Sequence, residues 1–211
     1  MATQQNLTTL IINAHTSIGQ ATAERYAALG TNIILYSSWN ESQAGQLISN
    51  IRAMGSKVTF LHAEAVKKMD FEKLFSQISK LQSPGVIAIH DIAKTFDLQM
   101  LRRLAMLSGA SFRLIYMVEI GTQSDLETVS GWMQTLALEN APRNATINAV
   151  IIPAGEQGLF STRTGPGDVA DAAEFFGFDL GNLITGQYLL LNATPKTLIT
   201  QSQPVYYENI D

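Results

Sequence analysis

The residues with the clearest chemical potential stand at the end of the first apolar run of the chain. Leu7–Asn13 has the length and apolar character of a buried strand, and Ile18–Leu29 has helical periodicity. The junction contains Asn13, His15, Ser17, Ile18 and Gly19. Backbone amides at a helix N-terminus hold an anion without clustered basic side chains. We therefore expect this junction to bind the phosphates of a nucleotide, and the alternative is that it only joins a strand to a helix.

A second group of polar side chains follows later apolar runs. His90 and Asp91 come at the end of the fourth run, and Glu119 and Thr122 come at the end of the fifth. A carboxylate at such a position acts as a base if burial raises its pKa. The alternative is that these side chains only hydrogen-bond the ends of loops. A metal site is not expected, because the three histidines stand in separate segments without ligand spacing.

The elements that must position these residues alternate regularly along the chain. The predicted strands are Leu7–Asn13, Asn32–Tyr36, Val58–His62, Val86–Ile89, Arg113–Val118, Thr146–Ile152 and Tyr188–Leu191. The predicted helices are Ile18–Leu29, Asn40–Met54, Asp70–Leu81, Leu98–Leu107, Asp125–Asn140 and Pro166–Phe176.

This alternation predicts one α/β domain of the Rossmann type. Its doubly wound, seven-stranded parallel sheet carries helices on both faces. We assign residues 1–193 to this domain and residues 194–211 to a C-terminal arm or tail. Ligands of such sheets bind beyond the carboxyl ends of the strands. The polar residues described above fall at those ends, so they form one candidate site.

The composition restricts the class of protein. Of the 211 residues, 46% are hydrophobic, and the formal net charge is −4. These values favour a folded core and argue against nucleic-acid binding, which needs clustered Lys and Arg. The absence of cysteine excludes disulfides, thiolate metal sites and cysteine nucleophiles. The first residues do not resemble a secretory signal, and no apolar run reaches the ~18 residues of a spanning helix. We expect a cytoplasmic protein without a membrane partner.

Several segments together resemble the short-chain dehydrogenase/reductase family. The first junction resembles the family's G-x-x-x-G-I-G turn, with Asn13 and Ser17 at the first two glycine positions and Gly19 at the third. Later matches follow in family order: Leu136–Arg143 with Ile147–Val150, Pro153–Gly155, Gly167–Ala173 and Ile184–Leu189. The resemblance covers nearly the whole chain and implies an NAD(P)-dependent oxidoreductase.

The catalytic motif of that family is missing. The family uses a Ser after strand five and a Tyr-x-x-x-Lys on the next helix, where the Lys lowers the pKa of the Tyr acid/base. Glu119 stands near the Ser position, Thr122 at the Tyr position and Leu126 at the Lys position. No Tyr-x-x-x-Lys occurs anywhere in the sequence. The resemblance therefore implies a degenerate active site, with Glu119 and Thr122 as the residues at catalytic positions.

The resemblance also implies a cofactor, NADP(H) or NAD(H). The residues at cofactor-binding positions are Asn13, His15, Ser17, Ile18, Gly19, Ser37, Ser38, Trp39, Glu64, His90, Asp91, Ile92, Pro153 and Gly155. No acidic residue ends the second strand, which favours NADP(H), with the Ser37 and Ser38 hydroxyls receiving its phosphate. Trp39 stacks on adenine or simply covers the next helix. The alternative is that no cofactor binds.

Three functions remain open from the sequence. The first is an oxidoreductase of this family with an unusual active site. The second is a non-catalytic relative that binds a nucleotide or a partner protein and works in assembly. The third is a different enzyme that uses Glu119. We expect a homo-oligomer, a dimer, in which the helix Asp125–Asn140 takes part through Trp132 and its apolar neighbours. The family resemblance does not identify the substrate.

Overall fold

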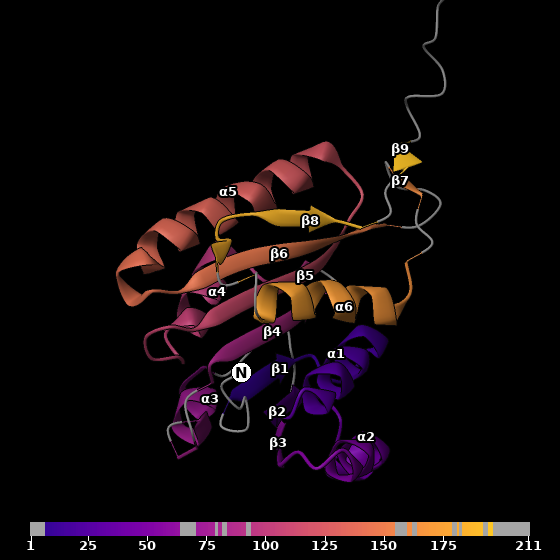
Figure 1. Cartoon of the computed structure of the whole chain (residues 1–211). Coiled ribbons are helices and arrows are strands. Elements are labelled where there is room, and N and C mark those ends of the chain that lie inside the picture. Colours follow the sequence, from indigo (N-terminus) through magenta and orange to yellow (C-terminus); the bar gives the residue numbers. More distant parts are fainter. Residues whose placement is uncertain are drawn as a thin grey trace, which may run out of the picture.

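The computed structural model describes residues 7–63, 71–78, 80–81, 84–91, 94–154, 160–161, 164–178, 181, 183–191 and 194–195. Within them, seven strands form one parallel sheet in the order β3-β2-β1-β4-β5-β6-β8 (Figure 1). The strands are β1 (Thr8–Ile12), β2 (Asn32–Ser37), β3 (Val58–His62), β4 (Val86–Asp91), β5 (Arg113–Ile120), β6 (Thr146–Pro153) and β8 (Tyr188–Leu190). This is the predicted α/β architecture of the Rossmann type.

Helices cover both faces of the sheet. They are α1 (Ser17–Ala28), α2 (Glu41–Ala53), α3 (Phe71–Ile78), α4 (Leu98–Ala105), α5 (Gln123–Asn140) and α6 (Pro166–Gly177), and a short 3₁₀ helix spans Ala141–Arg143. Figure 1 shows α1 and α6 side by side on one face. None of these described helices is long and apolar enough to cross a membrane.

The alternation of side chains along each strand divides the core into two clusters. On β1, Leu10 and Ile12 pack with α3, α4 and α5, whereas Ile11 packs with α1, α2 and α6. All three side chains are fully buried. Central strands with both faces covered read as continuous apolar runs, which is why the sequence predicted them well.

The order of the strands places the candidate site. β1 pairs with β2 on one side and with β4 on the other, so the direction of winding reverses between β1 and β4. Ligands of doubly wound sheets bind at this reversal, beyond the carboxyl ends of the strands. Ile12 lies beside Ile89 in the register. The next residues, Asn13 and His90, are therefore neighbours at the rim, which is the edge of the sheet formed by the carboxyl ends of its strands.

Several element boundaries differ from the prediction. α5 begins at Gln123, two residues before the predicted start, because the Thr122 side chain caps it by accepting from Asp125 N at 3.1 Å. β5 continues to Ile120, so Glu119 lies within the strand. A two-stranded antiparallel ribbon, β7 (Phe160–Ser161) with β9 (Thr194–Pro195), was not predicted, because two residues give no periodicity.

Helix α4 has eight residues and ends at Ala105, two residues before the predicted end at Leu107. Arg143 stabilises its C-terminal end. The guanidinium donates to Ala105 O at 3.1 Å and to Gly109 O at 3.0 Å, and it also donates to Ser108 O. Carbonyls at a helix end lack partners within the helix, so these hydrogen bonds satisfy groups that would otherwise lie partly buried and unpaired.

Candidate functional site

The turn between β1 and α1 is built on the backbone of Asn13. This residue has φ = 63°, in the left-handed region that asparagine tolerates better than most residues with a side chain. Its carbonyl accepts from Thr16 N at 3.1 Å, which closes the turn. Its side-chain Nδ2 donates to His90 O at 2.7 Å and so joins the ends of β1 and β4. Asn13 therefore supports the turn as expected for the position of the first glycine.

Gly19 is required by the close approach of α1 to the end of β1. A Cβ on this residue would lie 2.4 Å from Asn13 O and 2.9 Å from Ala14 Cα. Both are backbone atoms, so they cannot move aside as a flexible side chain would. Gly19, which matches the third glycine of the turn that this junction resembles, thus has a visible steric reason.

Thr16 organises the site, and the sequence analysis did not single it out. It is the N-cap of α1, and its Oγ1 accepts from Gly19 N at 2.8 Å and donates to Asn13 O at 3.1 Å. A threonine just before an apolar helical pattern is a recognised N-cap signal, so it was detectable. The amides of Ser17 and Ile18 have no acceptor among the described residues, as expected for the first turn of a helix.

His90 lies beneath this turn and is 3% exposed. Its Nδ1 is 2.8 Å from Thr16 Oγ1, whose one proton is directed to Asn13 O. His90 Nδ1 is therefore the donor in this contact, which leaves Nε2 as an acceptor. Burial lowers the pKa of His90 to about 4 and keeps the imidazole neutral at physiological pH.

Three buried polar atoms at this rim lack a hydrogen-bond partner within the described part of the chain. They are Asn13 Oδ1, His15 Nδ1 and His90 Nε2. Burial also lowers the pKa of His15. Buried polar groups are almost always hydrogen-bonded in native proteins, so this cluster points to a polar ligand or ordered water.

Asp91 faces the opposite side of the sheet from His90. Its carboxylate accepts from Thr95 N at 2.8 Å, Thr95 Oγ1 at 3.0 Å, Phe96 N at 2.9 Å and the Tyr116 hydroxyl at 2.8 Å. Burial first, and then Asp91, raises the pKa of Tyr116 well above its usual range. Contrary to its assignment as a cofactor contact, the Asp91 side chain supports the loop after β4.

The end of β2 offers less to a phosphate than expected. We predicted that the Ser37 hydroxyl receives a phosphate. In the structure Ser37 is 1% exposed and its Oγ accepts from Trp39 N at 3.1 Å, so this side chain is not open to a ligand. Ser38 is exposed and remains available. The Trp39 ring is half-buried against the α1/α2 core, with its centroid 6.4 Å from that of His15. The two rings lie together on the adenine side of the expected cleft.

The positions that match the catalytic residues of the family hold no equivalent groups. Thr122 is exposed and caps α5, and Leu126 is buried in the core. Glu119 alternates with Val118 and Ile120, so it lies on the α1/α6 face and not toward α5. Its side chain is partly exposed and forms no hydrogen bond with another described residue. The structure therefore brings Glu119, but not Thr122, to the face that carries His90.

The other residues predicted at cofactor-binding positions lie at the end of β6, in the first turn of α1 or outside the described residues. Pro153 ends β6 beside Ile120 and is buried. Ile18 is buried in the first turn of α1 and Ser17 is exposed there. Glu64, Ile92 and Gly155 lie outside the described residues. Among the residues that are described, no three His, Asp or Glu side chains group as metal ligands.

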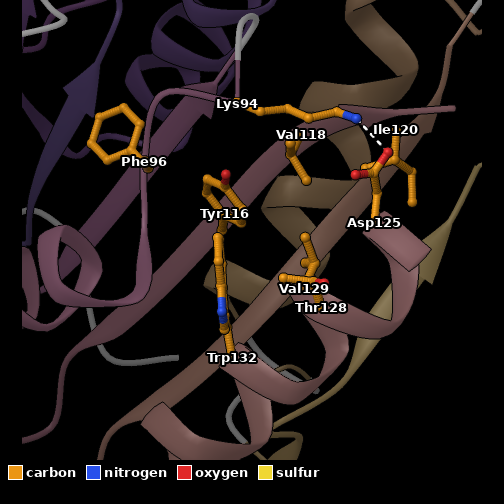
Figure 2. A pocket seen from close by; sticks show the side chains of 9 residues that line it. All are labelled: Lys94, Phe96, Tyr116, Val118, Ile120, Asp125, Thr128, Val129 and Trp132. Atoms are coloured by element: carbon orange, nitrogen blue, oxygen red, sulfur yellow. Dashed lines mark hydrogen bonds and ion pairs between the residues drawn. The ribbon is translucent and has the colours of Figure 1, made fainter. Parts of the chain in front are cut away.

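One cation–anion pair stands at the edge of the rim, on the face of α5. Lys94, which has φ = 50°, forms an ion pair with Asp125 (Figure 2). The hydrogen bond from Lys94 lowers the pKa of Asp125, and the Thr122 hydroxyl lowers it further. The lysine of the family motif has no counterpart at Leu126, which is buried, and Lys94 is paired with Asp125.

Substitution of Gly19 tests the close approach of helix to strand. We expect Gly19→Ala to destabilise the fold by about 1–3 kcal/mol, because the added methyl group overpacks backbone atoms. The matched control is Gly45→Ala in α2, where nothing lies within 4 Å of the new Cβ. That control should gain roughly 0.5–1 kcal/mol from helix propensity. Urea unfolding of both variants measures the difference, and equal effects would contradict the steric argument.

The neutral state of His90 predicts a pH dependence of stability. Its pKa is about 4 in the fold and 6.5 when exposed, so the unfolded chain binds more protons between these values. Stability should be complete above pH 6.5 and fall as the pH drops toward 4, by roughly 3 kcal/mol in total. His90→Asn, which cannot titrate, should flatten this part of the urea-unfolding profile. An unchanged slope in that variant would refute the assignment.

The comparisons with known proteins point to one fold. No protein-family model and no curated protein sequence matches the chain. Solved structures match over most of its length. A short-chain dehydrogenase/reductase from Serratia marcescens gives a TM-score of 0.72 at 15% identity, covering 90% of this chain and 97% of its own. A hydroxysteroid dehydrogenase from Escherichia coli gives 0.71 at 15% identity, covering 87% of this chain and 94% of its own.

A third match has a described reaction. The promiscuous reductase LugOII, which catalyzes keto-reduction at C1 during lugdunomycin biosynthesis, gives a TM-score of 0.68 at 19% identity. The match covers 90% of this chain and 96% of that one. Together with the strand order and the turn after β1, these matches show that the chain has the fold of the short-chain dehydrogenases/reductases.

Proposed function

We propose that this chain is a divergent member of the short-chain dehydrogenase/reductase family. In this proposal it is an NAD(P)(H)-dependent oxidoreductase with a degenerate active site. The observation that carries the proposal is the rim between β1 and β4. There Thr16, which precedes the amides of Ser17 and Ile18, contacts Nδ1 of buried His90. Among the described residues these two amides have no acceptor and His90 Nε2 has no partner. Fold alone does not decide function, and these groups are therefore what supports the proposal.

The polar groups at the rim fit the two kinds of polar group in a dinucleotide. The amides of Ser17 and Ile18, at the positive end of α1, suit a pyrophosphate. Asn13 Oδ1 and His90 Nε2 are acceptors and suit ribose hydroxyl groups, which are donors. Ser38 and the ring of Trp39 would hold the adenosine end. The nearest carboxylate on β4, Asp91, is turned away and so does not repel the phosphates.

The residues on α5 set the limit of the chemistry. A bound nicotinamide supplies or accepts a hydride, and the family's Tyr and Lys handle the accompanying proton. Thr122 cannot take the role of the Tyr, because it is exposed and caps the helix. Glu119, on the face that carries His90, is the ionisable side chain of β5 at this rim. In this proposal the carboxyl group of Glu119 exchanges the proton with the substrate oxygen.

A second candidate is a non-catalytic nucleotide-binding or assembly protein. The observation that favours it is the burial of Leu126 in the core at the position of the family lysine. A buried leucine neither lowers a neighbouring pKa nor holds a ribose. Under this reading the dinucleotide would stabilise the chain without being turned over, and the chain would act through a homo-oligomer or another protein.

Nucleotide binding is tested by the substitution Ser17→Asp. Ser17 is exposed in the first turn of α1, so an aspartate there suits the helix dipole and preserves the fold, but repels a phosphate. We expect wild type to gain about 2.7 kcal/mol at 100 times the dissociation constant of NADPH or NADH, and the variant to gain little. The measurement is the thermal unfolding midpoint with each nucleotide, and a larger shift with NADPH would support the preference for NADP(H).

The matched control is Ser124→Asp, at the N-terminus of α5, where Ser124 is also exposed. It adds the same charge to a helix that does not enter the nucleotide site and should bind as wild type does. Absence of a thermal shift with either nucleotide in the wild-type protein would overturn the proposed binding.

Turnover separates the two candidates. NADPH and NADH oxidation is followed across a panel of aldehydes and ketones, with Glu119→Gln beside wild type. We expect the variant to lose roughly 100-fold in rate, the usual contribution of a positioned acid or base. Glu127→Gln, exposed on α5, is the control and should retain full activity. Full activity in Glu119→Gln would exclude this residue, and binding without any turnover would favour the non-catalytic candidate.

A further inference from the structure

A cavity of about 140 Å³ lies between β5 and α5, beneath the segment that follows β4 (Figure 2). Its walls are apolar and include Phe96, Val118, Val129 and Trp132. The ion pair between Lys94 and Asp125 forms its polar edge. A concave, mostly apolar space with one polar edge is the usual composition of a small-molecule site.

The cavity is separate from the candidate nucleotide site. The α5 residues that line it, Asp125, Thr128, Val129 and Trp132, are spaced three and four apart and form one stripe of the helix. The positions that match the family's catalytic residues, Thr122 and Leu126, are not part of its lining. The His90 side chain lies on the opposite face of the sheet.

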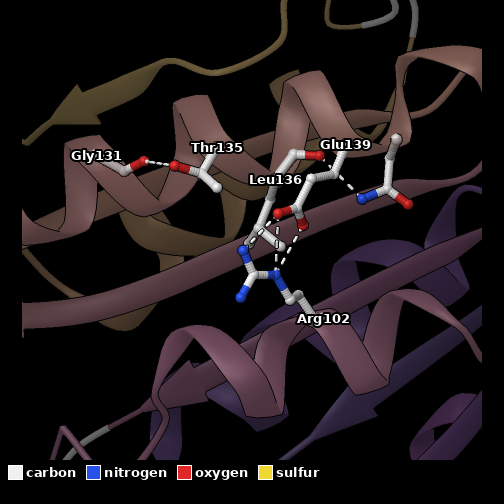
Figure 3. Close-up of polar contacts among 6 residues, drawn as sticks. Arg102, Gly131, Thr135, Leu136 and Glu139 are labelled. Carbon is white, nitrogen blue, oxygen red and sulfur yellow. Dashed lines mark hydrogen bonds and ion pairs between the residues drawn. The ribbon is translucent and has the colours of Figure 1, made fainter.

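The short α4 leaves this space beside α5. Arg102 on α4 holds Glu139 near the C-terminus of α5, with Nε 2.8 Å from one carboxylate oxygen (Figure 3). This pair draws the two helices together at the end of α5 opposite to Asp125. The first turns of α5 face the loop segment Lys94–Phe96 instead of a helix.

The polar groups of the cavity are not equally available. The Tyr116 hydroxyl points into the region but is already donated to buried Asp91 at 2.8 Å. Lys94 and Asp125 are 46% and 31% exposed, and pairs of this kind contribute at most about 1 kcal/mol. A ligand can therefore insert a group between them at small cost, while the floor remains apolar.

We propose that this cavity is a binding site for a monocyclic phenol. A 150 Å³ apolar cavity in another protein takes up one benzene ring, so a space of about 140 Å³ suits a single six-membered ring. The ring packs between Phe96, Val129 and Trp132. The hydroxyl group lies at the polar edge of the cavity, where it accepts from Lys94 Nζ and donates to the Asp125 carboxylate.

The Lys94–Asp125 pair favours a hydroxyl group on the ring over other substituents. A hydroxyl is both donor and acceptor, so it serves the cation and the anion at the same time. A carboxylate would pair with Lys94 but would be repelled by Asp125. An unsubstituted ring would leave the original ion pair unchanged and gain only the apolar contact. The site therefore ranks a phenol above benzene, and benzene above a benzoate.

The test is a ¹⁹F NMR titration of the full chain with 4-fluorophenol, fluorobenzene and 4-fluorobenzoate. We expect saturable line broadening with 4-fluorophenol, and affinity about tenfold higher than for fluorobenzene, since the hydroxyl adds hydrogen bonds to charged groups. Lys94→Met should lower the affinity for 4-fluorophenol to that of fluorobenzene. Equal affinities of wild type for 4-fluorophenol and fluorobenzene would overturn the role of the Lys94–Asp125 pair.

Filling the cavity tests its location. Val129→Phe places a ring inside the wall and should abolish binding of both neutral compounds. Thr128→Phe does the same from an exposed position, so it keeps the test valid if the core variant fails to fold. The matched control is Leu138→Phe, which adds a ring at a site 78% exposed on the same helix. Undiminished 4-fluorophenol binding in Thr128→Phe, or no saturable binding in wild type, would overturn the proposal.

Discussion

The contact between the first turn of α1 and the carboxyl end of β1 is the constraint on which the candidate site depends. Gly19 allows the helix to approach the Asn13 carbonyl, and Thr16 fastens the same carbonyl and the Gly19 amide. The first amides of α1 are thereby directed beyond the end of the sheet, where a doubly wound fold takes its ligand. His90 lies at the same rim, because β4 is the neighbour of β1 where the winding reverses. Its Nδ1 hydrogen-bonds the Thr16 hydroxyl.

The two faces of the sheet differ from the short-chain dehydrogenase/reductase pattern in different ways. On the α1/α6 face, Asn13 and Ser17 stand at two of the three glycine positions, and Asn13 adopts the left-handed conformation that the turn needs. On the α5 face, the residues that stand at the Tyr and Lys positions are a helix cap, Thr122, and a core residue, Leu126. The candidate binding groups are therefore present at positions that match the family pattern, whereas the family's acid/base groups are not. This asymmetry is the physical basis for placing nucleotide binding before catalysis in the proposed function.

Polar side chains at the rim divide into those that support the fold and those that remain open to a ligand. Asp91 accepts four hydrogen bonds and Ser37 one, so both are used inside the protein. Asn13 Oδ1 and His90 Nε2 are buried without a partner among the described residues. Residue type alone does not distinguish these cases, because each of these side chains stands at the end of a central strand.

The amino-acid sequence by itself determined the alternation of strands and helices, the parallel sheet and the role of Asn13 and Gly19 in the turn. These follow from local rules, namely continuous apolar runs, helical periodicity and backbone conformation. The direction of Asp91, the burial of Ser37, the position of Glu119 opposite α5 and the cavity beside Trp132 were decided only by the tertiary structure. They depend on strand register and on which helix covers which face, and these involve residues far apart in the chain. Whether a side chain at the rim faces a ligand or supports the fold depends on these distant residues. A local sequence pattern does not contain them.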